Sequence, residues 1–173
     1  MPVYVGGGTR TQSASDTSRS PAKPSVGGVG GVLYAVVASK NNDTHNCVDS
    51  NWVKLSQVDA GASFTASLWY APETASAPTF TWSSAAACSA RTMLYADPQN
   101  TLELVPGNST SNSGTGNPHT TSAITSTRDG SLFVYFDAAA ANTSLAQPSG
   151  WVEDDDTGSA TDGGRTAFGS KQA

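Results

Sequence analysis

The sequence is poor in charged residues. They fill only 13% of its 173 positions, against about 25% in an average soluble domain. Small uncharged residues take their place, because Ser, Thr and Gly together account for 61 of the 173 positions. These residues favour caps, turns and strands over helix interiors. The composition therefore argues against long helices and predicts many short strands joined by turns.

Basic residues are scarce, and their placement limits the kinds of partner. Nine Lys and Arg residues stand against fourteen Asp and Glu, a net charge of -5. The basic residues are over-represented in residues 1–30, which have an excess of two positive charges, whereas the remainder is acidic. Phosphate binding needs clustered Lys and Arg. We therefore expect no nucleic acid as partner.

Long apolar runs are absent. No segment approaches the roughly 20 apolar residues that a membrane span needs. The first six residues lack the charged segment leading into an apolar one that is typical of a secretion signal. We therefore expect a protein that is made in the cytoplasm and has no membrane partner.

Residues that carry chemistry are few. The two histidines, His45 and His119, lie far apart in polar stretches, and no spacing joins them to a carboxylate as in a zinc site. Neither a Gly-x-Ser-x-Gly elbow nor a phosphate-binding loop is present. Cys47 and Cys88 fit no CxxC pattern, so they are either buried thiols or a disulfide formed on oxidation. The sequence predicts no catalytic residue, no metal and no cofactor, and hence no enzyme.

One dense acidic run stands out at residues 153–156, Glu-Asp-Asp-Asp. Carboxylates gather in calcium loops, but the spacing of an EF-hand, with its glycine and distal glutamate, is missing. A solvated acidic loop, or a patch that holds a basic arm, is the favoured interpretation.

Aromatic side chains are the remaining candidates for a ligand site. Trp69, Tyr70 and Trp82, together with Tyr95, would form a sugar-stacking face if they were exposed. Aromatic residues in strands more often fill the core or cover its ends. Both interpretations stay open from the sequence.

The first 30 residues predict an extended N-terminal arm. They show no periodicity and are interrupted by glycines and prolines, so they bury too little apolar surface to offset the entropy lost on ordering. The apolar tip would dock as a short strand on a neighbouring copy or partner. A basic arm on an acidic body also suits contact between copies, although three basic residues in a tail need no function. The predicted interface residues are Val3, Tyr4, Val5, Arg10, Arg19 and Lys23.

Residues 31–173 predict an antiparallel β-sandwich, jelly-roll-like, of eight to ten short strands. Apolar runs and alternating patterns are bounded by turn residues, and the polar stretch 108–118 reads as an exposed loop. The alanine-rich residues 84–90 favour strand or irregular chain over a helical turn. The expected strands are 31–38, 52–55, 64–70, 79–83, 91–95, 102–105, 122–125, 131–136, 151–153 and 165–169.

An internal two-fold repeat is predicted between residues 31–70 and 130–169. In each half a buried strand leads through a polar loop to a Trp-Val pair, and 19 residues separate Leu33 from Trp52 and Leu132 from Trp151. We expect two equivalent three-strand units that close one core, each tryptophan covering an end.

These motifs resemble a family of β-sandwich domains in tailed-bacteriophage virion proteins and bacterial surface proteins. The likeness covers roughly residues 27–170, but it departs before Trp52, where Asp49-Ser50-Asn51 replaces the Pro-Pro-x-Gly that family members often have. The motifs that carry it are the Gly-x-Leu-x-x-x-Val strand at 31–37, Trp52-Val53, Pro78-Thr79-Phe80-Thr81-Trp82-Ser83, Met93-Leu94-Tyr95 and the closing part from Thr127 to Ala167.

The resemblance implies a structural virion protein, because the shared motifs are fold motifs without catalytic content. The favoured hypothesis is a capsid decoration, or cement, protein that staples neighbouring subunits through its arm. The alternatives are a carbohydrate- or receptor-binding module of a fibre or spike, and a tail accessory. Implied partners are the major capsid protein or other virion proteins, and further copies of the chain, with a trimer suiting a threefold axis. The implied location is the virion surface, after synthesis in the host cytoplasm.

Overall fold

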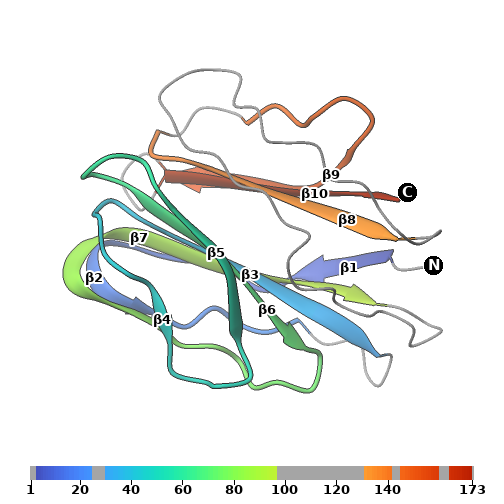
Figure 1. Ribbon diagram of the computed structural model, residues 1–173, viewed down its shortest axis with the longest axis horizontal. Coiled ribbons are helices and arrows are strands. Elements are labelled where there is room, and N and C mark those ends of the chain that lie inside the picture. The colour runs from blue at the N-terminus through green and yellow to red at the C-terminus, as the bar shows by residue number, and fades with distance from the viewer. Residues whose placement is uncertain (1–2, 25–29, 97–130, 142–144, 160–163, 173) are drawn as a thin grey trace.

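The computed structural model describes residues 3–24, 30–96, 131–141, 145–159 and 164–172. In this part of the chain there is no helix, and ten strands form two antiparallel sheets (Figure 1). The all-β prediction is confirmed. No described helix is long and apolar enough to cross a membrane.

The larger sheet has seven strands in the order β1-β7-β3-β6-β5, with β2 and β4 also paired to β7. Its central strand β3 is the predicted apolar run, and all its residues from Ala35 to Ser39 are buried. The strands are β1 (Val3–Gly7), β2 (Thr11–Arg19), β3 (Gly31–Ser39), β4 (Asn46–Cys47), β5 (Val53–Asp59), β6 (Thr65–Pro72) and β7 (Phe80–Ala96).

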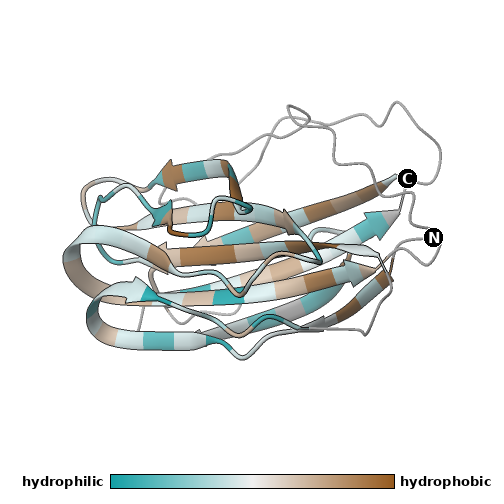
Figure 2. Cartoon of the chain, turned by 90° about the horizontal axis from the view of Figure 1, so that it is seen from below, coloured by the Kyte–Doolittle hydropathy of each residue, from teal (hydrophilic) through white to brown (hydrophobic). Residues whose placement is uncertain are grey.

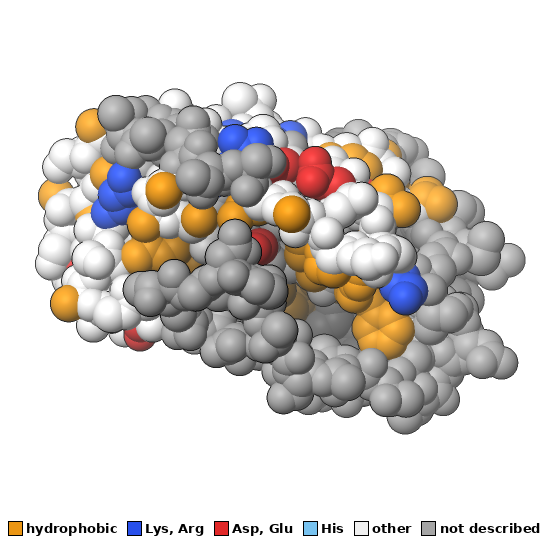
Figure 3. All heavy atoms as spheres, turned by 90° about the horizontal axis from the view of Figure 1, so that it is seen from above, with side chains coloured by type: hydrophobic (Ala, Val, Ile, Leu, Met, Phe, Trp, Pro, Cys, Tyr) orange, Lys and Arg blue, Asp and Glu red, His pale blue; other side chains and the backbone are white. Residues whose placement is uncertain are grey.

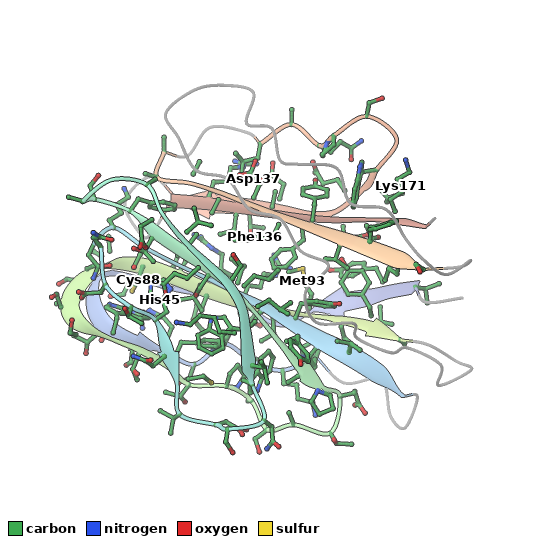
Figure 4. All side chains as sticks on the ribbon, viewed as in Figure 1. His45, Cys88, Met93, Phe136, Asp137 and Lys171 are labelled. Atoms are coloured by element: carbon green, nitrogen blue, oxygen red, sulfur yellow. The ribbon has the colours of Figure 1, made fainter. Side chains whose placement is uncertain are left out.

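The smaller sheet has three strands in the order β8-β10-β9 and packs across one face of the larger sheet (Figure 1). Its strands are β8 (Leu132–Ala139), β9 (Val152–Ser159) and β10 (Gly164–Gln172). Val36, Met93 and Phe168 are fully buried between the sheets, with Phe136 packed against them, and Figure 4 shows Phe136 and Met93 in this space. Apolar residues alternate with polar ones along several strands (Figure 2). The jelly-roll path stays a prediction, because residues 97–130, with the expected loop 108–118 and strands 102–105 and 122–125, lie outside the described residues.

Strand β7 runs unbroken for 17 residues. The sequence predicted two strands, 79–83 and 91–95, and the alanine-rich stretch between them continues the strand rather than interrupting it. Strand β7 pairs with β1 and β2 on one edge and with β3 and β4 on the other, and it curves strongly in Figure 1. The first half of β7 thereby encloses a second core, which holds Trp52, Trp69 and Phe80.

The prediction of an N-terminal arm separate from the sandwich is corrected. Residues 3–7 and 11–19 are strands of the larger sheet, both paired antiparallel with β7 of the same chain. Between them, the buried Gly8 donates its N–H to the carbonyl of Thr92 at 2.8 Å. The physical reason is backbone pairing, which needs no apolar pattern in the sequence of β2.

The two segments of the predicted repeat share one arrangement. In both, the third strand lies between the first and the second, as the orders β3-β6-β5 and β8-β10-β9 show. Both second strands also carry a β-bulge, at Leu55 in β5 and at Asp154 in β9. Each bulge lies three residues after the tryptophan of its half. The two tryptophans therefore enter equivalent strands.

The acidic run is a strand, which corrects the predicted loop. Residues 153–156 belong to β9. Asp156, whose side chain is 6% exposed, forms an ion pair with Arg165 of β10, with a second hydrogen bond of 2.7 Å. Asp154 accepts a hydrogen bond of 2.6 Å from the Tyr95 hydroxyl. Two of these carboxylates thus bond to residues of neighbouring strands.

Candidate functional site

A buried imidazole lies at the centre of a polar cluster. His45 lies with no exposed surface beside β7, near Cys88 (Figure 4). Its Nε2 is 2.7 Å from Ser39 Oγ and its Nδ1 is 2.7 Å from Ser67 Oγ. The ring also packs against Trp82, with centroids 5.4 Å apart.

The hydrogen bonds around this imidazole run in one direction. Trp69 Nε1 donates to Ser67 Oγ, whose own hydrogen remains available for His45 Nδ1. On the other side Ser39 Oγ donates to Asn41 Oδ1, so it accepts from His45 Nε2. The Ser39 bond therefore places a proton on Nε2, and a neutral ring accepts from Ser67 through Nδ1. Burial, helped by the Lys54 ammonium, lowers the pKa of His45 to about 4.

The Ser39–His45 pair has the spacing of a nucleophile and its base, yet both residues have no exposed surface. A substrate cannot reach a pair that the sheet covers. Together with the bond to Ser67, the pair links β3, β6 and the segment before β4. Within the described residues no three His, Cys, Asp or Glu side chains lie close enough to hold a metal ion. His119 lies outside the described residues.

The predicted stacking aromatics do not form a surface. Trp69 and Trp82 are each 5% exposed, and their indole N–H groups bond to Ser67 Oγ and to the carbonyl of Asp16. Tyr95 is fully buried between the sheets, and Tyr70 is half-buried. The core interpretation holds for the two tryptophans, because the curved β7 and β2 cover the outer face of the larger sheet.

The predicted interface residues divide into two groups. The three basic ones bond within the chain: Arg10 to the carbonyl of Gly164 at 2.8 Å, Arg19 to Asp16 at 3.0 Å, and Lys23 to the carbonyl of Ala75 at 2.9 Å. Of the three apolar ones, the two valines stay at the surface. Val3 and Val5 are 50% and 39% exposed, whereas Tyr4 packs against Tyr95 with ring centroids 5.6 Å apart.

A groove of about 410 Å³ opens where β1 meets the smaller sheet. Its walls are mainly apolar, and it includes one carboxylate and one ammonium group. Val152, which the sequence did not single out, is 64% exposed here. The lining residues are Val3, Tyr4, Leu132, Val152, Asp154, Ser170 and Lys171. Two of the predicted interface residues, Val3 and Tyr4, line this groove. The groove is therefore the candidate contact surface.

Comparisons with known proteins give no relative. No family model, no curated protein and no solved structure matches the chain.

Neither cysteine forms a disulfide in the structure: Cys88 is buried and Cys47 is half-buried. Of the two alternatives that the sequence left open, the structure has the separate thiols. Burial raises the pKa of the Cys47 thiol, which lowers its thiolate fraction at neutral pH.

We expect slow labelling of Cys47 and no labelling of Cys88 when the native protein meets a thiol reagent at neutral pH. Both should react at once in denaturant. Intact-mass spectrometry after timed alkylation, with and without a reductant, measures this. Equally fast labelling of both cysteines in the native protein would contradict the placement of these side chains. So would a mass lower by two hydrogen atoms without reductant, because it would indicate a disulfide.

Proposed function

We propose that this protein is a non-enzymatic structural component of a tailed-phage virion, a capsid decoration protein that binds a neighbouring major capsid subunit. The assignment to a virion is supported by the resemblance of residues 27–170 to phage β-sandwich domains. The observation that carries a contact role is the valine-lined groove beside β1.

The groove suits contact because its apolar groups are already exposed. Val3 and Val152 face it with half or more of their surface open to solvent. Covering one such valine contributes roughly 1.5 kcal/mol, about tenfold in affinity. Many identical copies on a shell multiply a modest contact through avidity.

The contact differs from the stapling arm that the sequence predicted. The N-terminal strands pair with β7 of their own chain, so they offer a rigid edge and its side chains. A partner then meets a preformed surface and loses less entropy than a flexible arm would on ordering.

The double variant Val3→Ser, Val152→Ser should bind virions about 100-fold more weakly than the native protein, because two apolar contacts are lost. Val48→Ser is the matched control, since Val48 is 71% exposed but does not line the groove. Co-sedimentation with particles that lack the protein measures binding, and circular dichroism checks the fold. Equal binding of all three proteins would refute the groove as the contact.

The carbohydrate- or receptor-binding alternative does not rest on Trp69 or Trp82. Both are core residues with bonded indole nitrogens. Such a function needs a different aromatic surface.

A further inference from the structure

An aromatic cluster lies on the outer face of the smaller sheet. Along β8, Leu132, Val134 and Phe136 face the core between the sheets, so the alternating Phe133 and Tyr135 face outward. The Trp151 ring stands edge-on to both, with centroid distances of 6.4 Å to Phe133 and 5.4 Å to Tyr135. The outer face of an antiparallel sheet is usually polar, so this cluster calls for an explanation.

Two polar groups of this cluster have no hydrogen-bond partner among the residues that the structure describes. The indole N–H groups of the other three tryptophans each donate within the chain. That of the half-buried Trp151 bonds to nothing in the described part of the chain. The hydroxyl of Tyr135 is buried and also lacks a partner there. A buried tyrosine hydroxyl normally has a partner, whereas the Trp151 N–H is not among the buried atoms that lack one. The unpartnered Tyr135 hydroxyl points to a ligand that supplies an acceptor.

Two local features of the sequence position the residues of this cluster. Gly150 adopts φ +80°, and Trp151 N donates to the carbonyl of Pro148 at 3.2 Å, so a tight turn presents the indole. Gly169 lies beneath Tyr135, because a Cβ at this position would be 2.2 Å from Tyr135 Cε1. In the first half the corresponding tryptophan, Trp52, is buried under the curved sheet and packs on Phe80.

Charged groups of both signs border the cluster. Lys171 pairs with Phe133 across the sheet and is exposed, as is Glu153 at the start of β9. Asp137 and Lys171 both lie on the outer side of the sheet in Figure 4. The space-filling view of this side shows apolar side chains beside acidic and basic ones (Figure 3). Burial raises the pKa of Tyr135 to about 12, and the neighbouring carboxylates contribute to this rise. Acidic groups therefore outnumber basic ones around this side chain.

We propose that Trp151, Tyr135 and Phe133 form a binding site for a neutral saccharide. The flat, C–H-rich face of a sugar ring suits stacking on an indole, while its hydroxyls both donate and accept. The Trp151 N–H would donate to a sugar oxygen, and the Glu153 carboxylate would accept from sugar hydroxyls. The buried Tyr135 hydroxyl would gain the acceptor that it lacks when its ring shifts to meet the sugar. The acidic border disfavours sialylated or sulfated sugars by like-charge repulsion. This role goes beyond the proposed contact with the capsid, since its aromatic residues do not line the groove and only Lys171 borders both.

The test is a glycan array probed with the full-length protein. The array carries neutral hexose and N-acetylhexosamine oligosaccharides, with sialylated and sulfated glycans as the anionic set. We expect binding to neutral glycans, weakened at least tenfold by Trp151→Ala and several-fold by Tyr135→Phe, which removes only the hydroxyl. Val48→Ser, outside the cluster, should bind like the native protein.

Three results would overturn the site: a blank array, binding confined to anionic glycans, or neutral-glycan binding that both variants retain. A protein ligand would also leave the array blank. Tyr135→Phe keeps the test decisive if Trp151→Ala does not fold, because it preserves the ring packing. Virion co-sedimentation of the same variants separates this site from the groove, since they should sediment normally even if glycan binding is lost.

Discussion

Replacing Gly8 by alanine should lower the free energy of unfolding by roughly 2–3 kcal/mol, whereas Gly6→Ala should leave it nearly unchanged. A Cβ at Gly8 would be 1.8 Å from the carbonyl oxygen of Ala22 and 2.5 Å from Thr92 Oγ1. A backbone oxygen cannot swing aside as a flexible side chain can. A Cβ at Gly6 meets nothing within 4 Å. Urea unfolding of both variants, followed by circular dichroism, measures the difference.

This pair of variants distinguishes a structural segment from a free arm. Both glycines lie in residues 1–30, and a free arm would tolerate either change equally. Deletion of residues 1–20 extends the test, because it removes β1 and β2 and uncovers Trp82, whose indole donates to Asp16. A domain with the usual stability of 5–15 kcal/mol would not survive that loss as a cooperative fold. An unchanged thermal transition after the deletion would refute the integrated strands.

Acidification from pH 6.5 to pH 4 should destabilise the protein by about 3 kcal/mol through His45. Burial lowers the pKa of this imidazole from 6.5 to about 4 in the folded state. Between these values the unfolded chain binds the proton and the folded one does not, so stability is complete above pH 6.5 and falls as the pH decreases. Protonation of Nδ1 would also reverse the bond to Ser67 Oγ, which would then accept from the imidazolium.

Urea unfolding at intervals between pH 7 and pH 4 checks this expectation. His45→Gln is the matched variant, because it lacks the titrating group and should show a flat profile over this window, at lower overall stability. The lowered pKa values of Asp16 and Asp43, due to hydrogen bonds from Arg19 and from the Ser84 backbone, matter only below about pH 4. A native profile as flat as that of His45→Gln would contradict the buried neutral imidazole.

Strands with apolar runs were predictable from the sequence. Residues 31–38 and 131–136 correspond to β3 and β8, since a buried strand must be apolar on the faces that it hides. Strand β2 was not predictable, because Thr11–Arg19 is polar apart from Ala14 and each of its residues is half-buried or exposed. Its place comes from distant backbone pairing with β7, which no local pattern encodes.

The candidate sites show a similar division. The apolar tip at Val3 and Tyr4 was recognised as a contact candidate, and it lines the groove. The sequence could not tell which aromatic residues are exposed, because that depends on which sheet face is covered. Trp52 and Trp151 occupy equivalent places in their halves, yet only the first is enclosed by the curved β7. The cue that was available is the Pro-Ser-Gly turn directly before Trp151, which favours a surface position.

Difference imaging of virions by electron cryo-microscopy tests the central claim most directly, using particles assembled with and without the gene for this chain. The account predicts additional two-layered density on the outside of the shell, touching a capsid subunit at the end that holds β1 and the start of β9. Superimposable maps of the two particles, or density confined to the particle interior, would contradict it.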